Sequence, residues 1–98
     1  DPANMILYDM GDPIRAVEIL GADIRSGHVK DAIRTKAPGT WGDEVPLGQG
    51  QVNIKRFIDT LKKVGFKGAL CIEREVGDQK QRVADIAHGV RVLKECLA

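Results

Sequence analysis

The sequence predicts an α/β domain, in which short strands and amphipathic helices alternate along the chain. Two short runs, residues 24–30 and 69–73, are predicted to be strands, and the second is apolar on both faces until its glutamate, as in a strand that is covered on both sides. Helical patterns precede the first run, separate the two runs and follow the second. Each strand is therefore followed by a helix, which favours right-handed crossovers and parallel pairing of the strands.

Size and composition limit the classes of protein to which the chain can belong. Its 98 residues suffice for one small domain, and 43% apolar with 30% charged residues is the composition of an ordinary globular protein. The net charge of +1 is made of interspersed signs, so we expect neither nucleic-acid binding nor a membrane-binding patch. No apolar run approaches the roughly 20 residues of a membrane span. Cys71 and Cys96 form no disulfide framework and are expected to be small core residues of a cytoplasmic protein.

The beginning of the chain is expected to be a loop, followed by the first helix. Residues 1–11 suggest a loop with a short apolar turn. Asp12 is a good N-cap, and Pro13 suits the first helical position, where its missing N–H costs nothing. Gly21 is expected to end this helix.

A long loop follows the first predicted strand. Residues 32–51 are rich in glycine and proline, and a loop of this length in a compact domain is usually functional or disordered. Trp41 and the interior prolines favour an ordered loop. The turn at residues 46–50 could present backbone N–H groups to a substrate, or be a plain turn.

Two further helices are predicted with their buried faces. Residues 53–64 carry apolar side chains at a clear helical spacing, and Gly65 follows them. Asp78 is expected to cap a last helix over residues 79–97, in which Gly89 suggests close packing. The predicted buried stripe of this helix is Val83, Ile86, Ala87, Val90, Leu93 and Leu97.

Candidate ligands for a divalent metal fall at the ends of the strands. The carboxyl ends of parallel strands form the usual site of an α/β fold, and His28, Glu73 and Asp1 are each expected there. One imidazole and two carboxylates suit Mn²⁺, Co²⁺, Zn²⁺ or Mg²⁺, with open positions for substrate oxygens. The spacing is no local metal motif, so plainer roles stay open. His28 could be a hydrogen-bonded rim residue, Asp1 a turn residue, and Glu73 a partner of Arg74 or Arg25.

Charged residues after the histidine are candidates for substrate binding. Lys30, Asp31 and Arg34 could bind substrate oxygens or a phosphate, or could form a solvated cluster of loop charges. His88, beside the apolar stripe of the last helix, is expected to be structural.

Taken together, these segments resemble the xylose-isomerase-like TIM barrels, and within them the sugar-phosphate isomerases and epimerases and the keto-sugar 3-epimerases. The resemblance covers nearly the whole chain. The matching pieces, in the order of the family, are Asp1-Pro2-Ala3-Asn4, Gly27-His28-Val29-Lys30-Asp31, Pro46-Leu47-Gly48-Gln49-Gly50 with Val52, and Cys71-Ile72-Glu73-Arg74-Glu75.

The resemblance implies roles for individual residues. In that family a (β/α)₈ barrel holds one divalent metal through Glu, Asp, His and Glu at the ends of strands five to eight. Asp1, His28 and Glu73 take the last three of these places. Arg34 matches a substrate-binding arginine, and Asn4 falls where some epimerases have a substrate-contacting histidine.

The resemblance also implies a reaction and an incomplete barrel. Glu73 would be one of two glutamates that move protons on opposite faces of a ketose or ketose phosphate, through a cis-enediolate. Residues 1–98 would form a single partial domain, the end of strand six with strands seven and eight and their helices. A whole barrel has about 250 residues, so we expect the isolated chain to be inactive. It should form a homo-oligomer or associate with the missing N-terminal part.

Other functions stay open on the same scaffold. Inosose dehydration and hydroxypyruvate isomerisation would keep the site and change the substrate. The endonuclease branch of the fold is less favoured, because it uses more histidines and a basic surface. A non-catalytic, self-associating fragment is the alternative of another class. The sequence does not decide whether the substrate is phosphorylated.

Overall fold

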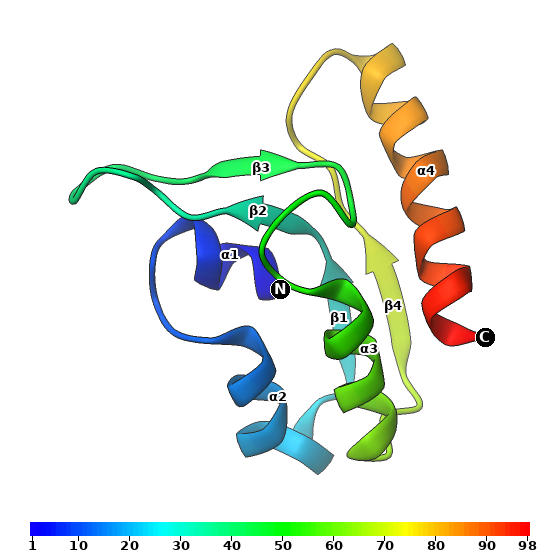
Figure 1. The fold of residues 1–98 in the computed structure, drawn as a ribbon. Helices are drawn as coiled ribbons and strands as arrows, with labels where there is room; N and C mark the ends of the chain where they lie inside the picture. Colours follow the sequence, from blue (N-terminus) through cyan, green and yellow to red (C-terminus); the bar gives the residue numbers. More distant parts are fainter.

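The computed structural model describes all 98 residues, Asp1–Ala98, and shows an open α/β arrangement without a closed barrel (Figure 1). No helix has both the length and the apolar character needed to cross a membrane. In chain order the elements are α1 (Pro2–Leu7), α2 (Pro13–Leu20), the 3-10 turn η1 (Gly21–Asp23), β1 (Ser26–Val29), β2 (Asp31–Ile33), β3 (Asp43–Val45), α3 (Ile54–Lys63), β4 (Ala69–Ile72) and α4 (Gln79–Leu97).

The two predicted strands, β1 and β4, pair directly and in parallel, as expected. His28 lies opposite Cys71, and the ladder continues past the strands, because the Glu73 N–H donates to the Val29 carbonyl at 3.1 Å. The intervening helix α3 packs against both α2 and α4. The strand ends that carry His28 and Glu73 therefore lie side by side.

The predicted helix boundaries at Asp12, Gly21 and Asp78 are confirmed. The Asp12 carboxylate accepts from the N–H groups of Ile14 and Arg15, and Gly21 follows the last residue of α2. The Asp78 carboxylate accepts from the Gln81 N–H at 2.8 Å. The two aspartates act locally, since each satisfies backbone donors of the first turn of its own helix.

Residues 1–11 are not the loop that the sequence suggested, because they contain α1. The Asp1 carboxylate accepts from the Asn4 N–H at 3.0 Å, and Pro2 takes the first helical position. The sequence signal for the start of α1 is an aspartate–proline pair, the same pair that begins α2. A helix of six residues is too short to show a clear helical period.

The long loop over residues 32–51 also contains structure that the sequence did not indicate. Its first residues belong to β2, which pairs with β3 as an antiparallel hairpin, and Ala32 lies opposite Glu44. Each of these strands has three residues, which leaves little alternation for a sequence pattern to reveal. The hairpin extends away from the end of β1 (Figure 1).

The predicted buried stripe of α4 is largely wrong. Its buried residues are Asp85, Gly89, Leu93 and Cys96, whereas Val83 is 61% and Leu97 49% exposed. The close packing expected at Gly89 is observed, because a Cβ there would lie 3.3 Å from Ile72 Cγ2. Because α4 places Gly89 against β4, most of the predicted apolar stripe of this helix faces away from the sheet.

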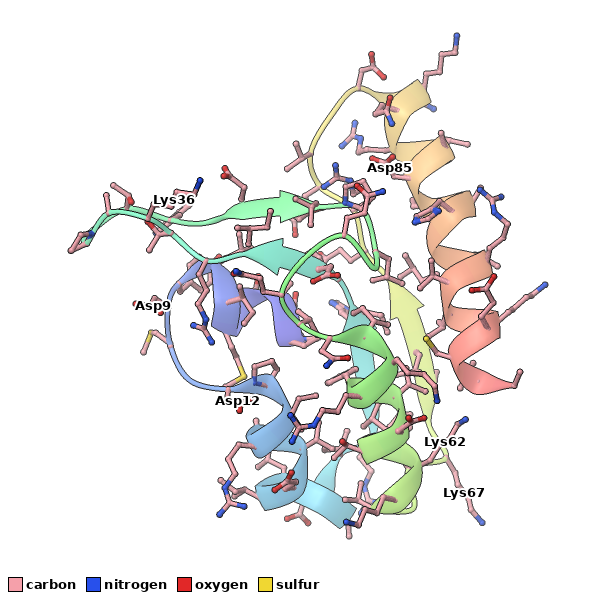
Figure 2. The ribbon with its side chains drawn as sticks, in the orientation of Figure 1. Asp9, Asp12, Lys36, Lys62, Lys67 and Asp85 are labelled. Carbon is pink, nitrogen blue, oxygen red and sulfur yellow. The ribbon has the colours of Figure 1, made fainter.

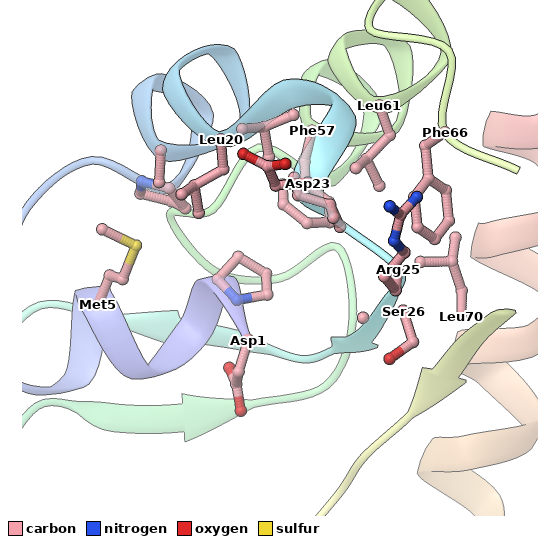
Figure 3. Close-up of a pocket in the computed structure, with 16 residues that line it drawn as sticks. Asp1, Met5, Leu20, Asp23, Arg25, Ser26, Phe57, Leu61, Phe66 and Leu70 are labelled. Atoms are coloured by element: carbon pink, nitrogen blue, oxygen red, sulfur yellow. The ribbon is translucent and has the colours of Figure 1, made fainter. Parts of the chain in front are cut away.

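Several apolar surfaces of the chain have no covering element. A hollow of about 390 Å³ lies beside β1, and Leu20, Phe57, Leu61, Phe66 and Leu70 supply apolar walls (Figure 3). Cys71 is exposed rather than in the core, because one face of β4 is open. Cys96 is buried, as expected.

The loop after β2 is held in place by the carboxylate of Asp31, a residue that is 1% exposed. One carboxylate oxygen accepts from the N–H groups of Ala32 and Val52, and the other from those of Gly48 and Gly50, all at 2.9–3.1 Å. A side chain at Gly50 would collide with this carboxylate and with the backbone of Ala32. The carboxylate thus fixes the turn at residues 46–50 and the start of α3 against the end of β1.

We expect Asp31→Asn to lower the free energy of unfolding by about 2–6 kcal/mol. Its amide nitrogen would face two backbone donors, and each buried donor left unsatisfied costs about 1–3 kcal/mol. Urea unfolding of the two chains measures the difference. Asp59→Asn, in an exposed pair with Lys55 on α3, is the control and should change the value by less than about 1 kcal/mol. Equal effects of the two substitutions would contradict the role of Asp31.

Candidate metal and substrate site

Three of the predicted site residues come together at the carboxyl ends of β1 and β4. Asp1, His28 and Glu73 each offer one ligand atom, and these atoms lie within 4.8 Å of one another. His28 lies near the end of β1, Glu73 directly follows β4, and Asp1 caps α1. The structure therefore groups residues that are up to 72 positions apart in the sequence.

The orientations of the three side chains are set by hydrogen bonds and ion pairs. One oxygen of Asp1 is held by the Asn4 N–H, and the other faces Lys30 at 3.4 Å. The Nδ1 atom of His28 lies 3.4 Å from Glu73 Oε2. The Glu73 carboxylate thus points toward β1, rather than to Arg74 or Arg25 as the alternative reading of the sequence allowed.

Lys30 lies within this group, with a side chain that is only 4% exposed. Its ammonium donates to Glu75 at 3.1 Å and lies 3.4 Å from Asp1 and 3.5 Å from Glu73. Burial lowers the pKa of Lys30, but the hydrogen bond to Glu75 and the charges of Glu73, Glu75 and Glu44 outweigh burial and raise the pKa above its ordinary value. Lys30 is therefore a permanent cation among carboxylates.

Glu75 is a member of this group that the sequence did not single out. The hydrogen bond from Lys30 is the largest of the interactions that hold the pKa of Glu75 below its ordinary value. Glu73 and Glu75 are two residues apart after a strand, so both can face the same side. The two-residue spacing in Glu73-Arg74-Glu75 is the sequence signal that could have identified Glu75 as a site residue.

The donor set fits a divalent metal ion. Carboxylate oxygens and an imidazole nitrogen are ligands of Mn²⁺, Co²⁺ and Zn²⁺, and the carboxylates also suit Mg²⁺. Ligand atoms on opposite sides of an ion, each at about 2.1 Å, lie about 4.2 Å apart. The spread of up to 4.8 Å would need to contract by a few tenths of an ångström. Asp1, His28 and Glu73 could then hold the ion, with coordination positions left open.

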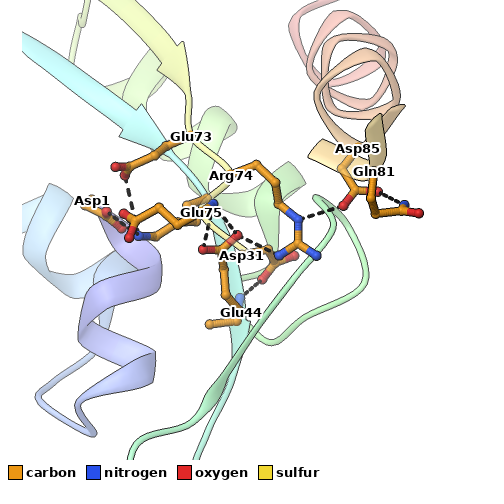
Figure 4. Close-up of polar contacts among 10 residues, drawn as sticks. Asp1, Asp31, Glu44, Glu73, Arg74, Glu75, Gln81 and Asp85 are labelled. Atoms are coloured by element: carbon orange, nitrogen blue, oxygen red, sulfur yellow. Dashed lines mark hydrogen bonds and ion pairs between the residues drawn. The ribbon is translucent and has the colours of Figure 1, made fainter. Parts of the chain in front are cut away.

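Arg74 points away from this group and joins a buried network of its own (Figure 4). Its guanidinium donates to Glu44 at 2.6 Å and to Asp85 at 2.8 Å, and all three side chains are at most 10% exposed. Gln81 donates to the second oxygen of Asp85 at 2.8 Å. Hydrogen bonds from Arg74 and then Gln81 hold the pKa of Asp85 below its ordinary value. This network ties the loop after β4 to β3 and α4.

The remaining candidate residues lie in other environments. Arg34 donates to Asp9 at 3.0 Å and to the Gly11 carbonyl at 3.2 Å, so its guanidinium is paired within the chain. Asn4 contacts the site through its backbone N–H, which donates to the Asp1 carboxylate. His88 hydrogen-bonds the Leu47 carbonyl at 2.9 Å, a structural contact.

Two suggestions about backbone and loop charges are corrected by the structure. The N–H groups of Gly48 and Gly50 donate to Asp31 and are not presented to a substrate. Asp31 is likewise fully engaged by backbone donors and is not a solvated loop charge. Both follow from the burial of the Asp31 carboxylate, which needs several donors.

Comparison with known proteins places this arrangement in context. A family model described as a xylose isomerase-like TIM barrel matches residues 1–96. The crystal structure of a xylose isomerase domain protein from Planctomyces limnophilus is 40% identical and superposes with a TM-score of 0.92. The match covers 98% of this chain and 36% of that chain, so this chain spans about a third of that protein's length. No curated protein matches the chain.

We expect Arg74→Met to lower the melting temperature, because it leaves two buried carboxylates without their cation. Because the pKa of Asp85 is depressed in the folded chain, its pairing with Arg74 stabilises the fold at pH values above the ordinary carboxyl pKa. This stabilisation is lost as the pH falls through the pKa that Asp85 has in the folded chain. The difference in melting temperature between the two proteins should therefore shrink below about pH 4. Arg15→Met, in an exposed pair with Glu18, should change little at any pH. A difference that stays constant with pH would contradict the assigned pairing.

Proposed function

Because this chain belongs to the xylose isomerase-like TIM barrel family, we propose that it supplies part of the active site of a divalent-metal-dependent sugar isomerase or epimerase. By the family resemblance, β1 and β4 would be the seventh and eighth strands of the complete barrel. The observation that supports the proposal is the grouping of Asp1, His28 and Glu73 around the paired strand ends, the position at which TIM barrels carry their chemistry.

Glu73 is the proposed general base. A bound divalent cation would polarise the carbonyl and hydroxyl oxygens of a sugar and make the adjacent C–H bond more acidic. The Glu73 carboxylate would then take the proton from that carbon. The C–H electron pair would form the carbon–carbon double bond of an enediolate, and the π pair of the carbonyl would move onto its oxygen. Return of a proton to a different carbon gives isomerisation, and return on the opposite face gives epimerisation. The group that acts on the opposite face is not part of this chain.

Lys30 supports this chemistry in two ways. Its ammonium lies 3.5 Å from the carboxylate of Glu73, the proposed base. It also lies 3.4 Å from Asp1 and donates to Glu75, so it keeps neighbouring carboxylates at fixed positions. A substrate hydroxyl could accept from the same ammonium, which is the substrate-binding role proposed for Lys30. Arg34 and Asn4 are proposed as substrate contacts on the family resemblance alone.

The chain alone is proposed to be inactive and to associate through its uncovered apolar surfaces. The hollow beside β1 and the exposed apolar residues of α4 have no covering element, and β1 and β4 form a sheet of only two strands. Unpaired strand edges and apolar faces favour association. The proposed partner is the remainder of the barrel, or a second copy of this chain.

We expect full-length protein with Mn²⁺ to interconvert ketoses, and Glu73→Gln to lower kcat by about 10²–10⁴-fold, since proton transfer contributes about that factor. His28→Ala should weaken Mn²⁺ binding, measured by titration calorimetry. The substrate panel includes an inosose and hydroxypyruvate, which test the other reactions of this scaffold.

The matched control for these variants is Glu95→Gln, an exposed glutamate near the end of α4, which should leave both kcat and Mn²⁺ affinity unchanged. Full activity and full Mn²⁺ binding in both site variants would disprove the proposed site.

Association of the isolated chain is tested by light scattering after size-exclusion chromatography. We expect a mass above the 10.7 kDa of one chain. Val83→Glu, on the exposed stripe of α4, should lower that mass, because a buried charge is costly. Val76→Glu, at an exposed position outside the helices, is the control. A monomeric wild-type chain would contradict this part of the proposal.

A further inference from the structure

The carboxylate of Glu44, on β3, contacts the segment that directly follows the proposed base. Its side chain is only 5% exposed, and its Oε2 atom accepts from the Arg74 guanidinium at 2.6 Å. The same carboxylate accepts from the backbone N–H of Glu75, whose nitrogen lies 3.2 Å from one oxygen and 3.3 Å from the other. Glu44 therefore binds both of the residues that come after Glu73 in the chain.

The contact with the Glu75 N–H restrains the backbone, which the ion pair with Arg74 does not do by itself. An arginine side chain has several rotatable bonds, so its guanidinium can follow a carboxylate while the loop moves. A backbone N–H has no such freedom and moves only with the chain. The hydrogen bond from Glu75 thus fixes the distance between β3 and the loop after β4.

Two further contacts attach the same segment to the end of β1. The Glu73 N–H donates to the Val29 carbonyl at 3.1 Å, and the Glu75 carboxylate accepts from the Lys30 ammonium at 3.1 Å. The segment is therefore held from β1 on one side and from β3 on the other. Between these attachments, the Glu73 carboxylate lies 3.4 Å from the Nδ1 atom of His28.

Together these contacts form a closed circuit around the site. Lys30 directly precedes β2, and β2 pairs with β3. From β3 the Glu44 side chain reaches the backbone of Glu75, whose own side chain returns to Lys30. The circuit fixes the spacing between the segments that carry His28 and Glu73, one at the end of each strand.

Asp85 shares Arg74 with Glu44 but does not restrain the loop backbone. It lies on the side of α4 that faces the loop after β4 (Figure 2). Its carboxylate accepts from two side chains, those of Arg74 and Gln81, each at 2.8 Å. Glu44 and Asp85 are therefore two buried partners of one guanidinium, of which Glu44 alone also binds the Glu75 N–H.

We propose that Glu44 is a positioning residue for Glu73, an inference that rests on the proposed function. Glu44 lies outside the group of Asp1, His28 and Glu73 that could hold a metal ion, so it acts through the backbone of the segment that it binds. By holding this segment, it keeps the Glu73 carboxylate where that group can share an ion with His28 and reach a substrate carbon. A misplacement of about 1 Å can cost about 10²-fold in rate.

The test compares Glu44→Gln with Asp85→Asn in full-length, Mn²⁺-loaded protein. Each change removes one charge from Arg74 at constant side-chain size, so we expect similar decreases in melting temperature. In Glu44→Gln the amide nitrogen must face Arg74 or the Glu75 N–H, which are both donors. We expect kcat to fall by about 10–100-fold, with a smaller change in KM, and the Mn²⁺ affinity measured by calorimetry to fall. Asp85→Asn should leave both close to the wild-type values.

Glu44→Asp separates positioning from folding. The shorter side chain keeps its charge, and the flexible Arg74 side chain can follow it, whereas the Glu75 N–H is held in place by the rest of its segment. We expect a melting temperature near that of the wild type, with kcat and Mn²⁺ affinity lowered as in Glu44→Gln. This variant decides the question even if Glu44→Gln does not fold.

Wild-type kcat and Mn²⁺ affinity in both Glu44 variants would overturn the inference, and so would equal losses in Glu44→Gln and Asp85→Asn. Failure of the proposed function would instead appear as no turnover of any ketose by the wild type. The Mn²⁺ affinities of the variants would then still decide whether Glu44 positions Glu73. A wild-type protein that binds no Mn²⁺ would overturn the metal site and this inference with it.

Discussion

The buried carboxylate of Asp31 holds together the parts of the chain that surround the site. It accepts from four backbone N–H groups that lie up to 21 residues away. A loop of this length loses much conformational entropy when it becomes ordered, and a carboxylate that satisfies several donors at once compensates part of that loss. The hairpin, the turn at residues 46–50 and the start of α3 are all joined to the end of β1 through this group.

At the ends of the two strands, side chains that face the site alternate with side chains that anchor the segment to the rest of the chain. At the end of β1, His28 and Lys30 face the site, whereas Asp31 binds the loop. After β4, Glu73 and Glu75 face the site, whereas Arg74 binds β3 and α4. Because successive residues of an extended chain point in opposite directions, each short segment supplies both functional groups and an anchor. The anchors limit the positions that the functional groups can take.

The open edges of the chain follow from the family to which it belongs. Two parallel strands of a barrel have neighbours on both sides in the complete fold, so their outer edges and the helices beside them are shaped to be covered. The exposed stripe of α4, the open face of β4 at Cys71 and the hollow beside β1 are therefore expected features of a third of a barrel. The polar network at the strand ends is, by contrast, complete in its own contacts, since no buried side-chain polar atom lacks a partner.

The sequence alone determined the features that arise from local physics. These are the order of strands and helices, the caps at Asp12 and Asp78, the buried face of α3, and the positions of His28 and Glu73 at strand ends. The tertiary structure decided the features that depend on distant partners. It selected the face of α4 that is buried, because Gly89 allows contact with Ile72 and Arg74 neutralises Asp85. It also gave Lys30 its three carboxylate neighbours and formed the β2–β3 hairpin. No local sequence pattern predicts these contacts, because the residues that stabilise them are far apart in the sequence and meet only when the chain folds.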